Sequence, residues 1–289
     1  MTGAPQATPP PSTYRRIRTT IGRLLRREAP GEGTLRRRLA GLGASFQPRR
    51  PGDVWRTWAN ASLRTSVEVD RAVAEVEACG LPAHKDRPKN WDLIVALGAI
   101  LERTSETGSV LEMGATQYSR LLPWLYLYGY RHLRGIDLVY DGPTQLGPIR
   151  YERMDLTATS YPDASFDAIA CLSVIEHGVD LDGYLREAAR LLRPGGILVT
   201  STDFWCEPVD TRGQEAYGGL IRIFAPADID RCLELAAGHG LTAAGPVDLG
   251  CDERVVHWER FGLDYTFLNF ILIKSGGPAS RGQPQRSPG

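Results

Sequence analysis

The sequence predicts an α/β fold built on a mainly parallel sheet with helices on both faces. Three observations support this prediction. From residue 109 onward, short apolar segments alternate with segments of helical periodicity, as in βαβ units. Gly114 directly follows the first apolar segment, where a nucleotide-binding turn is expected. The last two strand-like segments, 241–247 and 265–273, have no helix between them, so we expect them to pair antiparallel at one edge.

The N-terminal part of the chain is strongly basic. Residues 1–50 hold 11 arginines, no lysine and two acidic residues, a net charge of +9, although the 289-residue chain has a net charge of zero. We expect residues 1–52 to form a mostly disordered arm, in which 30–52 is a linker. Within it, residues 14–27 have the pattern of a basic amphipathic helix, which predicts weak contact with an anionic membrane surface. A solvated tail or a targeting peptide would have a similar composition. Because the basic run lacks interleaved aromatic residues, we do not expect nucleic-acid binding.

Residues 53–108 are expected to form a helical cap. The apolar spacing predicts one helix over 53–78, stopped by the glycine and proline that follow, and a second over 91–103 capped by Asn90. We expect both helices to pack beside the sheet and to cover the ligand site.

The βαβ unit at residues 109–137 determines which ligand we expect. Val110 to Met113 form a strand, 121–127 a helix, and 133–136 a strand that ends on Asp137, 23 residues after the turn glycine. An acid at this position can accept hydrogen bonds from ribose hydroxyls.

The turn itself argues against nicotinamide and flavin cofactors. These dinucleotides require a Gly-x-Gly-x-x-Gly turn, and Gly114 is the only glycine of this one. Glu112, two residues earlier, would repel a phosphate but suits a cationic ligand. S-adenosylmethionine carries an ammonium and a sulfonium and no phosphate.

The remaining elements continue the alternation up to residue 274, and residues 275–289 read as a disordered tail. We predict strands at 149–154, 166–172 and 197–200 and helices at 181–192 and 226–237. The five cysteines form no CxxC pair and are odd in number, which is typical of reduced, cytosolic cysteines and indicates no zinc site. Since no run of 18 apolar residues occurs, we expect no transmembrane helix.

Several segments in order resemble the class I S-adenosylmethionine-dependent methyltransferases, in particular the ubiquinone- and menaquinone-type group. They are the Glu112–Gly114 turn, Asp155–Leu156, Phe166–Ile169, the Ser173–His177 element and the Leu191–Gly196 junction. The resemblance covers about residues 89–274. It implies a Rossmann-like sheet of seven strands with an antiparallel last strand, in a methyltransferase domain at 109–274. In the turn, Thr116 and Tyr118 replace the later glycines of the family.

The resemblance also implies a cofactor site for S-adenosylmethionine. Glu112, Gly114, Ala115 and Thr116 would contact its methionine part. Asp137 would take the ribose hydroxyls, and Asp155 with Leu156 the adenine. Gly114, Asp137, Asp155 and Ser173 lie at carboxyl ends of strands, where ligands bind in open α/β sheets, so we expect one crevice.

For the reaction itself, His177 is the first candidate base and Asp203 the second. In some quinone-type relatives the Glu176–His177 pair holds a metal together with a further acid, but Ser173 occupies that position here, so we expect no metal. Further residues would line the acceptor pocket: Trp205, Arg212, Tyr217, Arg222 and, less directly indicated, His257 and Trp258. Aromatic residues with arginines would suit a sugar, particularly an anionic or nucleotide-linked one.

The sequence therefore predicts an O-methyltransferase for a small molecule, glycan or lipid precursor, cytosolic and with membrane contact through residues 14–27. Two alternatives remain open at this stage. One is a non-catalytic methyltransferase-like module, which the missing turn glycines would suit. The other is a nucleotide-sugar enzyme with a nicotinamide cofactor, which the lone Gly114 argues against.

Overall fold

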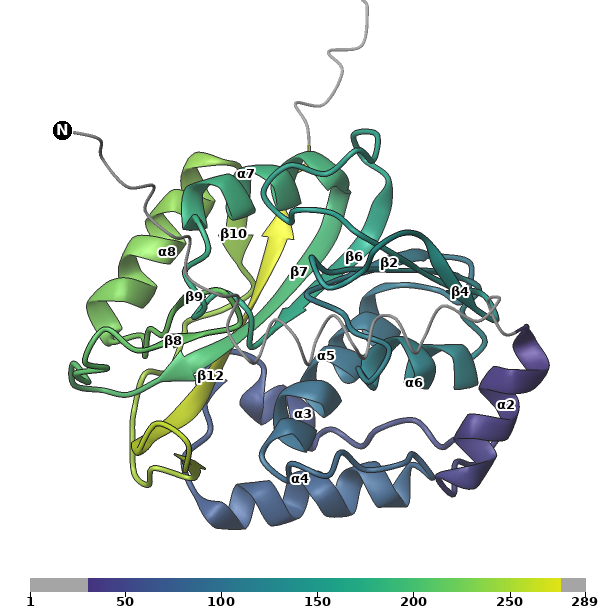
Figure 1. Ribbon diagram of the computed structural model, residues 1–289, viewed down its shortest axis with the longest axis horizontal. Helices are drawn as coiled ribbons and strands as arrows, with labels where there is room; N and C mark the ends of the chain where they lie inside the picture. Colours follow the sequence, from purple (N-terminus) through teal and green to yellow (C-terminus); the bar gives the residue numbers. More distant parts are fainter. Residues whose placement is uncertain (1–30, 277–289) are drawn as a thin grey trace, which may run out of the picture.

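The computed structural model describes residues 31–276, and within them one mixed sheet of ten strands forms the centre of the molecule (Figure 1). The strands of this sheet are β1 (Ala61–Ser62), β2 (Ser109–Met113), β3 (His132–Ile136), β4 (Thr144–Leu146), β5 (Ile149–Glu152), β6 (Phe166–Leu172), β7 (Leu192–Phe204), β10 (Leu241–Ala243), β11 (Val256–Trp258) and β12 (Leu263–Lys274). A separate short hairpin pairs β8 (Glu215–Ala216) with β9 (Gly219–Leu220).

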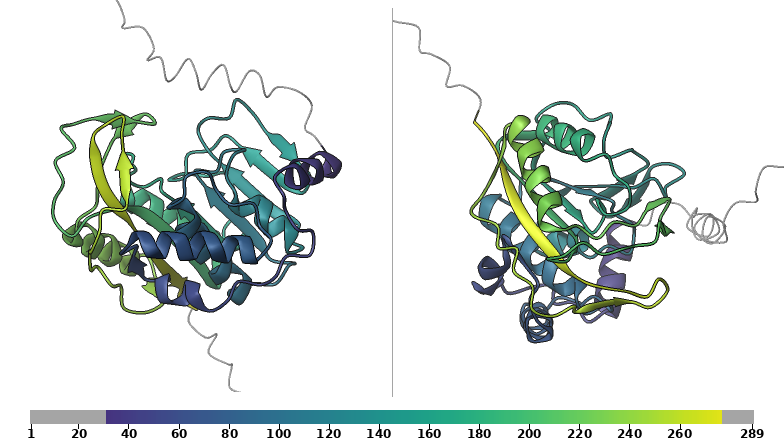
Figure 2. Two further views of the ribbon diagram at one scale, coloured as in Figure 1. Left: turned by 90° about the horizontal axis from the view of Figure 1, so that it is seen from below. Right: turned by 90° about the vertical axis from the view of Figure 1, so that its left-hand side faces the viewer.

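The sheet order is β1-β12-β7-β6-β2-β3-β5-β4, and β10 and β11 also pair with β12. The five strands β7, β6, β2, β3 and β5 run parallel to one another, and β4 is antiparallel to β5. Strand β12 runs antiparallel to β7, from the pair Thr266–Phe204 to the pair Ile273–Ile197, and β10 is antiparallel to β12. The predicted α/β, Rossmann-like fold and its antiparallel ending are confirmed. Strands β1, β4 and β11 extend the seven strands that we expected, and the start of β12 forms a hairpin with β11 (Figure 2).

Helices cover both faces of the sheet. They are α2 (Glu32–Gly41), α3 (Val54–Trp58), α4 (Ser66–Ala78), α5 (Lys89–Arg103), α6 (Leu121–Leu127), α7 (Leu181–Leu191) and α8 (Pro226–Gly238). Helices α5 and α6 pack on one face, with α4 outside α5, and α7 and α8 lie on the other (Figure 1). Each face has its own apolar core, exemplified by Trp91 and Trp124 on one side and Tyr184 and Phe270 on the other.

Helix α5 is the element that brings the helical cap to the site. All residues from Asn90 to Leu101 are buried, because α5 lies between the sheet and α4. At Gly98 a Cβ atom would overlap the ring of Trp55, so the missing side chain allows α3 to pack closely. This packing fixes the first turn of α5, with Lys89, at the carboxyl ends of β6 and β7.

Three predictions for the N-terminal segments are wrong. Residues 53–78 do not form one helix, since α3 ends at Trp58, Ala61 and Ser62 pair with β12, and α4 begins only after Thr65, whose side chain accepts a hydrogen bond from Glu68 N at 3.3 Å. Residues 30–52 are not a linker throughout, because α2 buries Leu35 and Leu39. Asn90 does not cap α5, which begins one residue earlier. The expected amphipathic helix at 14–27 lies outside the described residues.

Strand β7 is longer than predicted. We expected residues 197–200, but the strand runs to Phe204 because β12 pairs with it along its whole second half. Ser201, Thr202 and Asp203 are therefore buried strand residues and not part of a loop. Within residues 31–276 we find no helix with the length and apolar character that crossing a membrane requires.

Candidate active site

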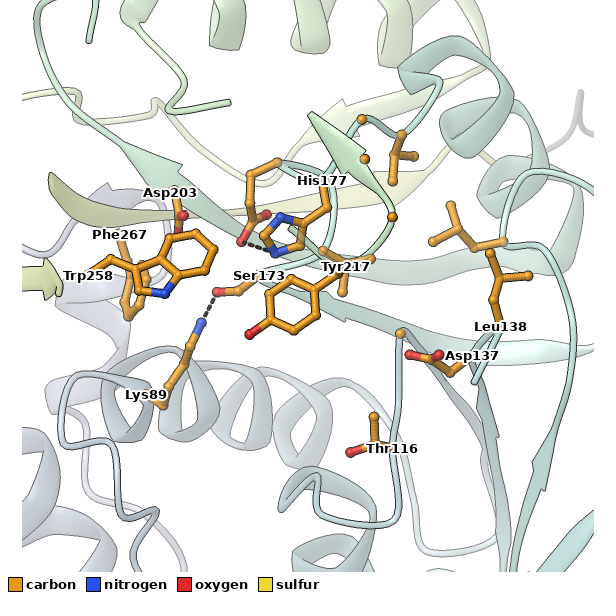
Figure 3. A pocket seen from close by; sticks show the side chains of 18 of the residues that line it. Lys89, Thr116, Asp137, Leu138, Ser173, His177, Asp203, Tyr217, Trp258 and Phe267 are labelled. Carbon is orange, nitrogen blue, oxygen red and sulfur yellow. Dashed lines mark hydrogen bonds and ion pairs between the residues drawn. The ribbon is translucent and has the colours of Figure 1, made fainter. Parts of the chain in front are cut away.

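A cavity of about 770 Å³ opens at the carboxyl ends of β2, β3, β6 and β7 (Figure 3). Its size is in the usual range of small-molecule sites. The two ends of the cavity differ in character. One end, here named the aspartate half, is lined by Gly114, Thr116, Asp137, Leu138, Asp155 and Leu156. The other, the aromatic half, is lined by Lys89, Glu176, His177, Asp203, Tyr217, Trp258, Tyr265 and Phe267.

The turn after β2 requires glycine for two reasons. Gly114 has φ +78°, a left-handed conformation that L side chains rarely adopt. A Cβ atom at this position would also overlap Cγ2 of Val174, which follows β6. The turn and the Ser173–His177 element, which we identified separately in the sequence, are thus in direct contact.

The backbone N–H groups of this turn are engaged within the protein. Gly114 N and Ala115 N donate to the carbonyl of Ile136 at 2.8 and 3.0 Å, and Thr116 N donates to Ser119 Oγ at 3.1 Å. Ala115 is fully buried, and its side chain lines neither cavity described here. The expectation that Ala115 contacts a ligand is therefore not supported by the geometry, whereas Gly114 and Thr116 do line the large cavity.

Asp137 and Asp155 both lie in the aspartate half, and each also shapes its own turn. One oxygen of Asp137 accepts from Val139 N at 2.7 Å. One oxygen of Asp155 accepts from Thr157 N at 2.8 Å and from the Thr157 hydroxyl at 2.7 Å. These turns hold both carboxylates at the cavity, so the turn role and a ligand role are compatible. The predicted convergence of Gly114, Asp137, Asp155 and Ser173 on one crevice is confirmed.

A second cavity of about 310 Å³ adjoins the first and shares Asp86, Lys89, Ser173 and Tyr217 with it. Asp92, Glu112 and Arg120 line this smaller cavity. Each has a buried polar atom without a hydrogen-bond partner among the described residues: Asp92 Oδ1, Glu112 Oε2 and Arg120 Nε. Burial raises the pKa of Glu112 to about 8, raises the pKa of Asp92 and lowers the pKa of Arg120. Buried polar groups are rarely left unpaired, so these atoms are suited to a ligand with charges of both signs.

Lys89 and Ser173 connect the two cavities. The Lys89 ammonium donates to Ser173 Oγ, lies 4.0 Å from Asp92 Oδ2 and stands 4.1 Å from the centre of the Phe267 ring. Ser173 has φ +51°, and its N–H donates to the Ser201 carbonyl at 3.0 Å. A non-glycine residue in this conformation is strained, and such strain concentrates at functional sites. Sequence reasoning missed Lys89, which has no motif of its own.

Two carboxyl groups, Glu176 and Asp203, are buried together in the aromatic half. Asp203 hydrogen-bonds to Glu176 and to the Tyr265 hydroxyl. Burial raises the pKa of Asp203 to about 7, while the charge of Lys89 opposes this shift. Burial and the neighbouring Asp203 raise the pKa of Glu176 well above its ordinary value. Both pKa shifts favour the protonated forms of the pair.

Three rings from different parts of the chain form a wall of the aromatic half. His177 follows β6, Tyr217 lies in the β8–β9 turn and Trp258 ends β11 (Figure 3). The ring centre of His177 is 4.7 Å from that of Tyr217 and 6.2 Å from that of Trp258. His177 Nε2 lies 4.0 Å from Glu176 Oε1. Trp258 and His257 do line the cavity, as the sequence indicated, and Tyr265 and Phe267 were not expected.

Three predicted acceptor residues are not part of either cavity. Arg222 forms an ion pair with Asp228, and its guanidinium lies over Phe224. Trp205 has the Arg254 guanidinium over its ring at 4.4 Å and packs against the core. Arg212 is exposed on the loop before β8. The assignment of Trp205, Arg212 and Arg222 to an acceptor pocket was therefore wrong, and only Tyr217 of that group is in place. Among the described residues, no three His, Cys, Asp or Glu side chains gather as a metal site requires.

Residues 111–200 match the sequence profile of the family described as methyltransferase domain. This segment is a methyltransferase domain. It contains the turn, both aspartates, Ser173 and the Glu176–His177 pair, and the cofactor of such a domain is S-adenosylmethionine. The resemblance to class I S-adenosylmethionine-dependent methyltransferases is thereby confirmed, but no subgroup is singled out.

Similar proteins carry different methyltransferase names. The chain is 31% identical over 114 residues to the 27-O-demethylrifamycin SV methyltransferase of Amycolatopsis mediterranei, which is 39% of this chain and 35% of that protein. It is 45% identical over 58 residues to the demethylmenaquinone methyltransferase of Deinococcus radiodurans, which is 20% of this chain and 24% of that protein. The matched segment thus spans about a third or less of these relatives. Among solved structures, the 1,6-didemethyltoxoflavin-N1-methyltransferase of Burkholderia thailandensis is 17% identical, with a TM-score of 0.45 and 94% of both chains covered.

Proposed function

We propose that the protein is an S-adenosylmethionine-dependent methyltransferase that methylates a hydroxyl group of a small, ring-shaped acceptor. The observation that carries this proposal is the pair of adjoining cavities. The smaller one presents unpaired acidic and basic atoms, which suit the zwitterionic methionine end of the cofactor. The larger one presents Asp137 and Asp155, which suit the ribose and the adenine.

In this arrangement the residues of the smaller cavity divide by charge. Glu112 and Asp92 would accept hydrogen bonds from the cofactor ammonium, and Arg120 would donate to its carboxylate. These contacts would favour the ionised forms, which burial alone disfavours. The N–H groups of the turn after β2 already donate to Ile136 and Ser119, so they would not hold the cofactor. The turn would instead give the cofactor room, because Gly114 has no side chain.

When bound, S-adenosylmethionine supplies an electrophilic methyl group on a sulfonium sulfur. Ser173 and, within the aromatic half, His177 and Tyr217 lie on the side that faces the aspartate half, where the cofactor and the acceptor would meet (Figure 3). The three-ring wall would orient the acceptor ring.

Asp203 would accept the proton of the reacting hydroxyl, and its pKa of about 7 suits a base at neutral pH. We assign this role to Asp203 in preference to His177, whose ring packs against Tyr217 and Trp258. His177 would then help to position the acceptor. The names of two partial relatives, the rifamycin enzyme and the ubiquinone biosynthesis O-methyltransferase of Methylocella silvestris, support transfer to oxygen.

The test is incubation of the full chain with deuteromethyl-labelled S-adenosylmethionine and a metabolite extract, followed by mass spectrometry. We expect a labelled product with the wild type. An Asp203→Asn variant should form it at least 100-fold more slowly, as expected when a general base is lost, with unchanged affinity for S-adenosylhomocysteine. Tight cofactor binding without any labelled product would instead indicate a non-catalytic binding module.

A further inference from the structure

The large cavity is lined by more acidic than basic side chains. The acidic residues are Asp86, Asp137, Asp155, Glu176, Asp180 and Asp203. Lys89 is the only lysine or arginine that lines the cavity in residues 31–276, where two histidines, His177 and His257, also contribute. The charge at this surface therefore disfavours an anionic ligand, apart from any cofactor contribution.

The single lysine is already engaged by groups of the protein. Its ammonium donates to Ser173 Oγ, faces the buried Asp92 carboxyl and lies over the Phe267 ring. Its charge also opposes the pKa rise of Asp92, Glu176 and Asp203. One cation thus serves three buried carboxyl groups, and its contacts with Ser173, Asp92 and the Phe267 ring already occupy it.

The arginines that could bind an anion near this region point elsewhere. Arg222 is paired with Asp228. Arg254 lies over the Trp205 ring and donates to the Asp264 carbonyl at 3.0 Å. Phosphate and carboxylate sites in proteins usually contain an arginine fork or a helix N-terminus with available N–H groups. No arginine lines the aromatic half among the described residues. The N-terminus of α5 does reach it at Pro88 and Lys89, but the first N–H groups of this helix, from Lys89 to Trp91, donate to the carbonyls of Asp86, Arg87 and Pro88.

The groups that do face the aromatic half suit an uncharged ring with hydroxyl groups. Tyr217, Trp258 and His177 offer ring faces, and Asp203 and Glu176 offer buried oxygen atoms. Aromatic faces pack well on flat, weakly polar rings, and carboxylates accept hydrogen bonds from hydroxyls. A negative group in the same place would lie beside the buried Asp203 carboxyl, and once this is ionised the two like charges repel more strongly than in bulk water.

We propose that the aromatic half selects an uncharged, hydroxylated ring and rejects acceptors that carry a phosphate or carboxylate there. This inference rests on the proposed function, which supplies the acceptor site. It reverses the suggestion from the sequence of an anionic or nucleotide-linked sugar, because Arg212 and Arg222, on which that suggestion depended, lie outside the cavity. The unmodified acceptor is a free compound and not a nucleotide-activated one.

Three probes of similar size and different charge test the selection directly. Benzyl alcohol, benzylamine and benzoate are titrated by ligand-observed NMR into the full chain saturated with S-adenosylhomocysteine at pH 8. We expect benzoate to bind at least tenfold more weakly than benzyl alcohol. In Asp203→Asn, and to a smaller extent in Asp86→Asn at the exposed edge of the cavity, this ratio should fall. Asp230→Asn, an exposed substitution on α8, should leave it unchanged. Equal or tighter binding of benzoate to the wild type would overturn the proposal.

A second measurement needs no chosen probe. The deuteromethyl-labelled products from the metabolite extract are passed over an anion-exchange column at pH 8. A labelled product in the unbound fraction supports the inference, and a labelled product that is retained as an anion overturns it. If no labelled product forms, the proposed methyl transfer has failed, and the probe series still decides the charge preference of the cavity.

Discussion

Replacement of Gly114 by alanine tests the contact between the two motifs that build the cofactor side of the cavity. The residue has φ +78°, and an alanine in this conformation costs about 1–2 kcal/mol. Its methyl group would also overlap Val174, and such overpacking costs about 1–3 kcal/mol. The expected loss of stability is about 2–5 kcal/mol, a large share of the 5–15 kcal/mol that stabilises a typical domain.

The chain offers a matched control for this substitution. Gly195 has almost the same φ, +79°, but a Cβ atom there would meet nothing within 4 Å. Gly195→Ala should therefore lose only the conformational share, about 1–2 kcal/mol. The difference between the two alanine variants isolates the clash with Val174.

Urea unfolding of the two glycine variants, of Val174→Ala and of the double variant Gly114→Ala/Val174→Ala completes the cycle. Removal of the Val174 methyl groups should abolish the clash in the double variant and restore the stability that the clash costs. The coupling energy between the two substitutions should therefore be about 1–3 kcal/mol. If Gly114→Ala were no more destabilising than Gly195→Ala, or if Val174→Ala gave no recovery, Val174 would not lie over the turn as described.

Three further predictions concern the site. Asp137→Ala should weaken S-adenosylhomocysteine binding about tenfold to a hundredfold in calorimetry, because hydrogen bonds to a charged group have about this value. The control Asp230→Asn should leave the affinity unchanged. Unchanged affinity in Asp137→Ala would remove this residue from the site. Burial raises the pKa of Glu112 from 4.5 to about 8, so the folded state keeps a proton that the unfolded state loses as pH rises through this interval. Its contribution therefore lowers stability by about 1.4 kcal/mol per pH unit between these values. Glu112→Gln should flatten the fall in urea unfolding free energy from pH 5 to 8, and an unaltered slope would contradict the assignment. Tyr217→Ala should raise the acceptor KM by a larger factor than it weakens S-adenosylhomocysteine binding, because Tyr217 lines both cavities. Leu220→Ala, on the same hairpin, should change neither. An equal effect of both substitutions would mean that the hairpin acts only as a structural support.

The sequence was sufficient for elements whose signal is local. The strand that ends at Met113, the glycine after it and the strand that ends before Asp137 were correctly predicted, because apolar runs and turn residues are read over a few positions. The same reasoning gave the crevice, since carboxyl ends of parallel strands meet at one edge.

Long-range pairing explains most of what the sequence did not reveal. Ala61 and Ser62 interrupt the expected helix because they pair with Asn269 and Leu268 of β12, about 200 residues later. The same strand extends β7 to Phe204 and brings Tyr265 and Phe267 to the cavity. None of these contacts leaves a periodic trace in the local sequence.

Charged side chains were the least predictable part of the site. Arginines are typical of anion sites, but neither Arg222 nor Arg212 lines the cavity. Arg222 pairs with Asp228, and Arg212 lies on an exposed loop. Lys89 had no motif, and it lies in the cavity as the first residue of α5, which begins one residue before Asn90. A side chain's direction depends on where its element starts, and element boundaries are the least certain part of a sequence-based prediction.

The central claim is that the smaller cavity holds the amino-acid end of the cofactor and the larger one its adenosine. Calorimetric titration of wild type and Arg120→Met with S-adenosylhomocysteine and with 5′-methylthioadenosine, which lacks the amino-acid end, tests it directly. We predict that both ligands bind the wild type and that Arg120→Met weakens only S-adenosylhomocysteine, by tenfold or more. Failure of the wild type to bind S-adenosylhomocysteine, or an equal loss for both ligands in the variant, would contradict the claim.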